Sequence, residues 1–250
     1  MTQSYKEILA TRSLSRRKII RLIQASATAI LAGYMGNQAA SGKPKNPATP
    51  AKKISCVVKP QQTEGPYFVD ERMNRSDIRS DPSDNSVREG TALRLIFHIS
   101  QVDGNSCKPF AGAVDLWHCD ASGVYSDVSD RSFNTQGKKF LRGYQVTDKN
   151  GTAQFITIYP GWYPGRAVHL HFKIRTDSAT QTSYEFTSQL YFDDSLTDQI
   201  HAQPPYISKG QRTLNAQDII FQDGGKDLLL RLSKDEKGYV GTFDIGLQIS

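Results

Sequence analysis

Two histidines, His169 and His171, lie two residues apart in a stretch where histidines alternate with apolar residues. A β-strand over residues 168–172 would point both imidazoles to one face and the apolar side chains to the other. Imidazole is a common metal ligand, but histidine is also a common polar residue in strands. The pair alone is therefore a weak sign of a metal site, and further ligands would have to strengthen it.

Oxygen donors close to this pair in the sequence would have to be tyrosines. No Asp or Glu occurs between Asp148 and Asp177, which argues against a local site of two histidines and one carboxylate. Tyr163, just before His169, and Tyr125, which follows a predicted strand, are the candidates. Most tyrosines in a chain are core or rim aromatics. A phenolate is nevertheless a hard anionic donor, which suits ferric iron better than zinc or ferrous iron.

The elements that would position these residues are mostly strands. Apolar alternation, or enrichment in β-branched and aromatic residues, predicts strands over residues 92–100, 113–119, 153–158, 168–174, 184–192 and 239–249. Clusters of Gly, Asn, Asp and Pro predict turns between them, and the one helical pattern is a short stretch at 227–232. Short strands separated by turns predict an all-β fold, either an antiparallel β-sandwich core with long loops or a barrel.

The charge of the chain is unevenly distributed. The first 55 residues contain ten Lys and Arg and one acidic residue, which leaves 21 basic and 24 acidic residues for the rest. The formal net charge of +6 therefore arises from the amino-terminal segment and not from the body. Because the body has no basic excess, a nucleic-acid partner is not expected.

The amino-terminal segment has the pattern of a twin-arginine export signal. Arg16 and Arg17 precede a mostly apolar stretch at residues 22–35, and small residues at 39–41 offer a cleavage site, which neighbouring frames fit almost as well. A membrane anchor is the alternative, but an anchor needs about twenty apolar residues, and polar residues interrupt this stretch. We therefore predict an export signal over residues 1–41.

The composition changes after the signal. Residues 42–55 are rich in Lys, Pro, Ala, Asn and Thr and have almost nothing to bury, which predicts a flexible linker. The body, residues 56–250, is long enough to bury one core without help from disulfides. We expect an exported protein, periplasmic or extracellular, with no stable membrane span, and the sequence makes no prediction of its oligomeric state.

Three cysteines, Cys56, Cys107 and Cys119, fall in the body. In an oxidising compartment they permit one disulfide, with three alternative pairings and one thiol left over. No Cys-x-x-Cys spacing occurs, so a structural zinc site is disfavoured.

Several further motifs occur in order along the body. They are Thr63-Glu-Gly-Pro-Tyr-Phe68, Asp115-Leu-Trp-His-Cys-Asp-Ala-Ser-Gly-Val-Tyr125, Arg142-Gly-Tyr-Gln-Val-Thr-Asp148 and Gln189-Leu-Tyr-Phe192, with Tyr163, Arg166, His169 and His171 before the last. Together these motifs resemble the intradiol ring-cleavage dioxygenases, and specifically their compact branch related to protocatechuate dioxygenase. Several motifs in the right order make this match far more specific than a lone His-x-His pair.

The resemblance implies a mononuclear non-haem iron(III) centre, Fe(3+), with catechol and O2 as substrates. Its protein ligands would be Tyr125, Tyr163, His169 and His171. Tyr163 would leave when substrate binds, Arg166 matches the family's catalytic arginine, and Gln189 matches a glutamine near the substrate.

The implied reaction is cleavage of a catechol-type ring between its two hydroxyl-bearing carbons, which gives a cis,cis-muconate-type diacid. Residues 63–67 match a segment that can border the substrate pocket. Two features depart from the family pattern. The link from Tyr163 to His169 is shorter than in protocatechuate dioxygenases, which would open the pocket and weakens the expectation of a carboxylated catechol. The helical amino-terminal dimer module of the catechol branch is also absent.

Two other functions would use the same residues. One is a secreted transthyretin-like binding module without ring-cleavage activity, which a shared fold alone would permit. The other is an exported copper or zinc protein that uses His169 and His171, and this function leaves the paired tyrosines unexplained. The presence of Arg166 and Gln189 beside four residues of ligand type favours the dioxygenase.

Overall fold

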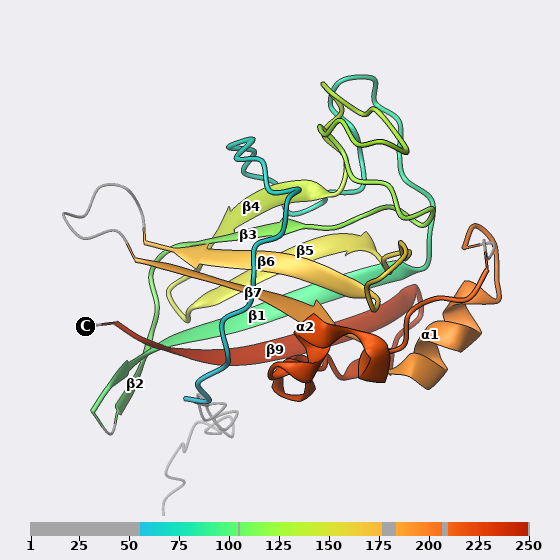
Figure 1. Ribbon diagram of the computed structural model, residues 1–250. Helices are drawn as coiled ribbons and strands as arrows, with labels where there is room; N and C mark the ends of the chain where they lie inside the picture. Colours follow the sequence, from blue (N-terminus) through green and yellow to red (C-terminus); the bar gives the residue numbers. More distant parts are fainter. Residues whose placement is uncertain (1–55, 105, 177–183, 207–209, 250) are drawn as a thin grey trace, which may run out of the picture. The chain divides into compact units, whose positions relative to one another are not determined.

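The computed structural model describes residues 56–104, 106–176, 184–206 and 210–249. The predicted export signal and linker lie outside the described residues. Strands form most of the regular structure of the described part (Figure 1). In chain order the elements are β1 (Ala92–Asp103), β2 (Ser106–Pro109), β3 (Ala113–Trp117), β4 (Arg142–Val146), β5 (Thr152–Ile158), β6 (His169–Arg175), β7 (Glu185–Tyr191), α1 (Asp194–His201), the 3-10 turn η1 (Asn215–Gln217), α2 (Ile219–Gln222), the 3-10 turn η2 (Gly225–Leu228), β8 (Leu232–Lys234) and β9 (Gly238–Gln248).

Strand β1 is the centre of the first sheet. One of its edges pairs antiparallel with β5 and, further along, with β2, while its other edge pairs in parallel with β9. Strand β8 extends this sheet beyond β9. Alternate residues of β1 are buried, namely Leu93, Leu95, Phe97 and Ile99, because successive side chains point to opposite faces. This face forms one wall of the core.

The second sheet contains four antiparallel strands in the order β4, β3, β6, β7 (Figure 1). Phe172 of β6 meets residues of the first sheet, with its ring centroid 5.3 Å from that of Phe97 and 5.5 Å from that of Phe243. Leu170 and Ile174 lie in the same buried cluster. Two sheets packed through one core form a β-sandwich, which confirms the predicted all-β class.

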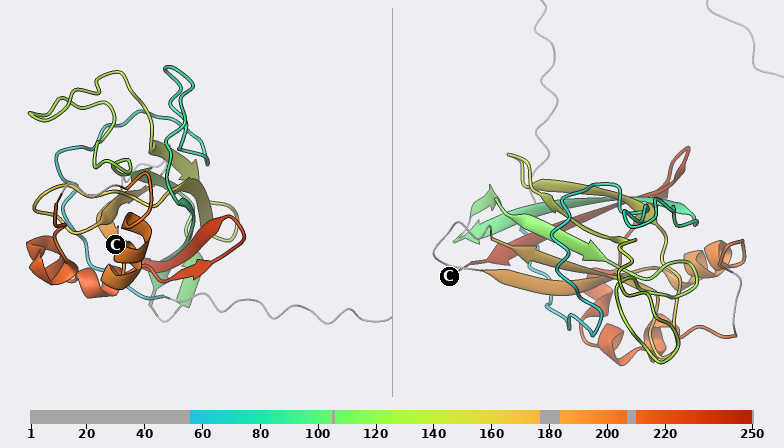
Figure 2. Two further views of the ribbon diagram at one scale, coloured as in Figure 1. Left: turned by 90° about the vertical axis from the view of Figure 1, so that its right-hand side faces the viewer. Right: turned by 90° about the horizontal axis from the view of Figure 1, so that it is seen from above.

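The helices and the long loop between β3 and β4 lie at the same end of the strands (Figures 1 and 2). Carboxylates fix where both helices begin. Asp193 accepts a hydrogen bond from the backbone N–H of Leu196 at 2.9 Å, and Asp218 accepts one from the backbone N–H of Ile220 at 2.8 Å. Strand β6 begins at this end, so its first residues face these loops.

The six predicted strands correspond to β1, β3, β5, β6, β7 and β9. The named strands pair antiparallel, as predicted, except β1 and β9, which run in parallel. The route of the chain between two distant strands sets their direction, and local patterns do not encode that route. The helical prediction at 227–232 is also wrong, because η2 ends at Leu228 and Leu232 starts β8. Pairing with β9 overrides local propensity there.

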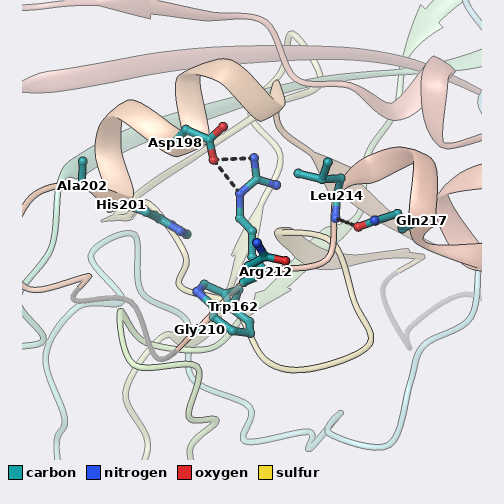
Figure 3. Close-up of a pocket in the computed structure, with 9 residues that line it drawn as sticks. Trp162, Asp198, His201, Ala202, Gly210, Arg212, Leu214 and Gln217 are labelled. Atoms are coloured by element: carbon teal, nitrogen blue, oxygen red, sulfur yellow. Dashed lines mark hydrogen bonds and ion pairs between the residues drawn. The ribbon is translucent and has the colours of Figure 1, made fainter.

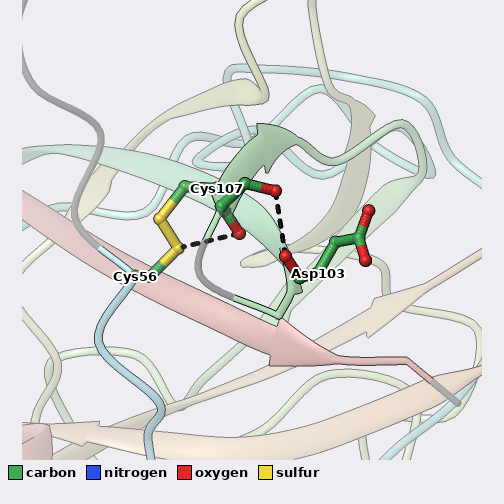
Figure 4. The surroundings of a disulfide bond; sticks show 4 residues. Cys56, Asp103 and Cys107 are labelled. Atoms are coloured by element: carbon green, nitrogen blue, oxygen red, sulfur yellow. Dashed lines mark hydrogen bonds between the residues drawn. A yellow bond between two sulfur atoms is a disulfide. The ribbon is translucent and has the colours of Figure 1, made fainter.

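A disulfide joins Cys56 to Cys107 of β2, with their Cα atoms 5.8 Å apart (Figure 4). Cys119 is a free, buried thiol. The structure therefore selects one of the three pairings that the sequence left open. Across the part of the chain that the structure describes, none of the helices combines the length and the apolar character needed to cross a bilayer.

Candidate metal centre

His169 and His171 lie on β6, between β3 and β7. Their imidazoles share one face of the sheet, with the two Nε2 atoms 3.1 Å apart, and both side chains are buried. Nδ1 of His169 donates to the carbonyl of Ala167 at 2.7 Å, so Nε2 keeps its lone pair. Trp117, opposite on β3, stacks on His171 with the ring planes 8° apart. Strand alternation thus produces a fixed pair of nitrogen donors.

Tyr163 reaches the histidines from the loop between β5 and β6. Its hydroxyl oxygen is 3.1 Å from Nε2 of His169. The loop after β3 packs tightly against this one, since a Cβ at Gly123 would lie 2.2 Å from the carbonyl oxygen of Trp162. Gly123 also has a φ of +84°, which L side chains rarely adopt. Glycine at this position lets the loop that carries Tyr163 settle over the β3–β4 loop.

Tyr125 enters from the loop between β3 and β4 and is 1% exposed. The buried guanidinium of Arg142 holds the next residue, with Nε and Nη2 donating to the carbonyl of Ser126 at 3.1 and 2.6 Å. The Tyr125 ring centroid lies 5.8 Å from that of Tyr163 and 6.3 Å from that of His171. Its hydroxyl has no hydrogen-bond partner of normal geometry among the described residues. The four residues predicted as ligands are therefore brought together.

Burial shifts the pKa of each of these four side chains toward the uncharged form. It lowers the pKa of His169 to about 3 and the pKa of His171 well below its usual value. It raises the pKa of Tyr163 to about 12, and it raises the pKa of Tyr125 further above the usual value, to which the neighbouring Tyr163 adds. Both imidazoles are thus neutral donors at pH 7, and the phenols need a nearby cation to ionise.

The donor set fits a ferric ion. A buried hydroxyl without a partner of normal geometry is costly, and a cation beside Tyr125 would offset that cost. Two phenolates would offset most of the charge of iron(III) and limit the cost of burying it. Among the described residues, no group of three or more His, Cys, Asp or Glu has the arrangement of a metal site. A metal held here therefore depends on tyrosine oxygens.

Arg166 lies beside this cluster and is held by two side chains. Its Nη2 donates to Oε1 of Gln189 at 2.5 Å, and its Nε donates to Oδ2 of Asp218 at 3.0 Å. Asp218 is fully buried, and the same oxygen accepts the backbone N–H of Ala167 at 2.8 Å. Asp218 was not predicted from the sequence as part of the site. Its only local signal is the start of α2, which says nothing about a partner 52 residues earlier.

An amino-terminal strap, residues 60–67, crosses the edge of the site. Gln189, which pairs with His171 across the sheet, donates from Nε2 to the carbonyl of Thr63 at 2.9 Å. Gly65 has a φ of +73°, and a Cβ there would lie 3.2 Å from Cε1 of His171. The strap therefore lies directly against the edge of this imidazole, and a side chain at Gly65 would crowd it.

A hollow of about 660 Å³ opens beside Tyr163. Its aromatic walls are Tyr67, Phe133, Trp162 and Tyr206. The ring of Tyr67 also lies 4.7 Å, centroid to centroid, from that of Tyr125. The hollow therefore reaches one of the four predicted ligands, Tyr163, and lies close to a second, Tyr125.

A second hollow, of about 450 Å³, shares Trp162 with the first (Figure 3). Polar residues line much of it, and Arg212 donates from Nη2 to Oδ1 of Asp198 at 2.8 Å. None of the four predicted ligands borders it. Of these two hollows, only the first is lined by a predicted ligand, Tyr163.

Comparison with known proteins gives consistent relatives. A family model described as Dioxygenase matches residues 63–248. Catechol 1,2-dioxygenase 1 of Acinetobacter lwoffii is 28% identical over 162 residues, which cover 54% of this chain and 49% of that protein. The chain thus spans about half the length of this relative.

Two solved structures are similar across most of the body. An intradiol ring-cleavage dioxygenase from Tetranychus urticae superposes with a TM-score of 0.64 and 33% identity, covering 78% of this chain and 95% of that one. The dioxygenase domain of a dioxygenase carbohydrate-binding protein fusion from Streptomyces sp. SirexAA-E gives a TM-score of 0.55 and 27% identity, covering 78% of this chain and 100% of that one.

Proposed function

Because the chain belongs to the intradiol ring-cleavage dioxygenase family, we propose that it uses iron(III) to cleave a catechol-type ring between its two hydroxyl-bearing carbons. O2 is the second substrate, and both of its atoms enter the product, a cis,cis-muconate-type diacid. The observation that carries the proposal is the convergence of His169, His171 and Tyr163, through contacts of 3.1 Å, beside the buried hydroxyl of Tyr125.

The side chains have different tasks in this proposal. When bound, iron(III) supplies Lewis acidity and an acceptor for electron density from the catechol ring. His169, His171 and Tyr125 hold it, since all three are buried and packed. Tyr163 lines the hollow, so an incoming substrate reaches it first. The Tyr163 oxygen would accept a proton from one catechol hydroxyl.

Arg166 supplies a fixed positive charge beside the reacting ring. Its guanidinium remains ionised at any pH of interest, and the bonds to Gln189 and Asp218 set its direction. Negative charge that develops on the ring during oxygen insertion is stabilised by such a preorganised cation. This role requires no movement of Arg166 during the reaction.

The proposal includes export by the twin-arginine route, from the leader pattern described above. The disulfide between Cys56 and Cys107 supports it, because disulfides persist mainly in oxidising compartments.

The test is turnover of catechol by the iron-loaded full chain under isotopically labelled O2. We expect a diacid that carries two labelled oxygen atoms, detected by mass spectrometry, and a visible colour from tyrosinate-to-iron charge transfer. The zinc-loaded chain is the matched control and should be colourless. A semialdehyde formed by cleavage beside the diol, or an iron-containing chain that consumes no O2 with any catechol, would refute the proposal.

A further inference from the structure

The hollow beside Tyr163 has room for more than one ring. Its volume of about 660 Å³ lies in the range of pockets that bind drug-sized ligands. Tyr67, Phe133 and Trp162 give it aromatic walls, which favour apolar or aromatic groups on a ligand. A catechol at the metal would therefore direct a substituent on its ring into this space.

The hollow also carries a negative charge on its wall. Asp130 is the one charged side chain among the described residues that line it. Its Oδ2 accepts the hydroxyl of Tyr67 at 2.9 Å, and its Oδ1 accepts the backbone N–H of Ser132 at 3.0 Å. These bonds, that of Ser132 first, hold the pKa of Asp130 below its usual value. Asp130 is thus a carboxylate at neutral pH, fixed at the wall of the hollow.

Among the described residues that line the hollow, none is a cation that would offset this charge. Arg131 follows Asp130 in the chain but is not among the lining residues. Arg166 does not line the hollow either, and its guanidinium is bonded to Asp218 and Gln189. A carboxylate on the substituent would therefore meet repulsion without a partner, whereas an uncharged or cationic substituent would not.

We infer that the substrate is a catechol with a bulky substituent that carries no negative charge, and that Asp130 is the specificity residue that disfavours carboxylated catechols. This inference rests on the proposed function and names the substrate class for the same site. The effect is modest in size, because Asp130 is exposed and solvent screens its charge.

The test compares three catechols whose substituents match in length and end in a carboxylate, a primary amide or an ammonium group. The wild type should show the lowest kcat/KM with the carboxylate. Asp130→Asn should raise the carboxylate-to-amide ratio of kcat/KM roughly two- to fivefold and lower the ammonium-to-amide ratio similarly, the range expected for exposed charges. Added salt should reduce the preference of the wild type. A catechol that carries an aryl substituent should show a lower KM than catechol itself.

Two variants make the outcome decisive. Glu236→Gln removes the same charge from the exposed β8–β9 turn and should leave the ratios unchanged. Tyr67→Phe keeps Asp130 but removes the hydroxyl that donates to its carboxylate. It should shift both kcat/KM ratios in the same direction as Asp130→Asn, but by less. It also serves if Asp130→Asn does not fold.

Three results would overturn the inference: a wild type that prefers the carboxylate, ratios that Asp130→Asn leaves unchanged, or equal KM values for the aryl-substituted and plain catechols. If plain catechol is cleaved but any one of these results is found, only this inference fails and the proposed function stands. If no catechol is cleaved by the iron-loaded chain, the proposed function itself fails.

Discussion

Replacement of Asp218 with Asn tests how Arg166 is positioned. The carboxylate accepts Arg166 and Ala167 at one oxygen and Ile220 at the other. An amide has one oxygen, so its NH2 group must face either the N–H groups of Arg166 and Ala167 or that of Ile220. A donor then meets donors in a site where Asp218 is 0% exposed, and the buried ion pair loses its anion.

The loss should be large in stability and smaller, but clear, in turnover. Breaking a buried ion pair by removing one partner costs about 3–5 kcal/mol, which lowers the Tm of a domain of this size by roughly 6–20 °C. A guanidinium that is no longer fixed should cost roughly ten- to a hundredfold in kcat. Iron content should be retained, because none of the four predicted ligands contacts Asp218 directly through a side-chain hydrogen bond.

The stability of Asp218→Asn should also depend on pH differently from that of the wild type. Burial opposes the charge on Asp218, but the N–H of Ala167 and the guanidinium of Arg166 outweigh burial and hold the pKa of Asp218 below its usual value. The ion pair therefore stabilises the wild type fully above the usual carboxyl pKa, and this contribution disappears as the pH falls through the lower pKa of the folded state. The difference in Tm between the two proteins should shrink over that acidic window.

The assay is kcat per bound iron, with Tm and iron content measured on the same samples. Asp223→Asn is the matched control, since Asp223 is an exposed carboxylate at the end of α2, and it should behave as the wild type. If Asp218 acts through Arg166, Asp218→Asn should add little to the kinetic loss of Arg166→Ala. Full kcat in Asp218→Asn, or a further loss of equal size in the double variant, would refute the positioning role.

Three further predictions concern the ligands and the leader. Tyr125→Phe should lose most of the iron and of the visible colour by metal analysis and absorbance, and a fully loaded, coloured variant would remove Tyr125 from the ligand set. Tyr163→Phe should keep iron through the other three residues but bind catechol more slowly, because a proton acceptor is gone. The binding rate in stopped-flow traces should rise with pH, and wild-type binding rates would contradict this. Arg16→Lys with Arg17→Lys should leave the precursor inside the cell on fractionation, and unchanged export would exclude the twin-arginine route.

Local patterns predicted the parts of the fold that depend on near neighbours in the chain. The alternation around His169 and His171 was enough to place both imidazoles on one face, because that depends only on the geometry of a single strand. That Tyr125 and Tyr163 reach the same point was implied by the resemblance to the dioxygenase family and not by local patterns. Alternation likewise indicated β1 and β9, since each buries one side against the core.

Local patterns do not predict contacts between distant parts of the chain. The parallel pairing of β1 with β9 and the choice of Cys107 as partner of Cys56 depend on the path of the whole chain. Asp218 shows the same limit within the site. Its sequence neighbours mark only a short helix, and its contact with Arg166 exists because the start of α2 lies against the loop that precedes β6.

The two halves of the candidate centre differ in mechanical support. The histidines belong to a strand that is paired on both edges, so their spacing cannot change without breaking the ladder of the sheet. The tyrosines belong to loops, which can shift while the sheet stays intact. Any adjustment to an incoming molecule must therefore come from the loops that carry the tyrosines, while the two histidines keep their positions on β6. Hydrogen exchange should record this division as slow exchange in β6 and faster exchange around Tyr163.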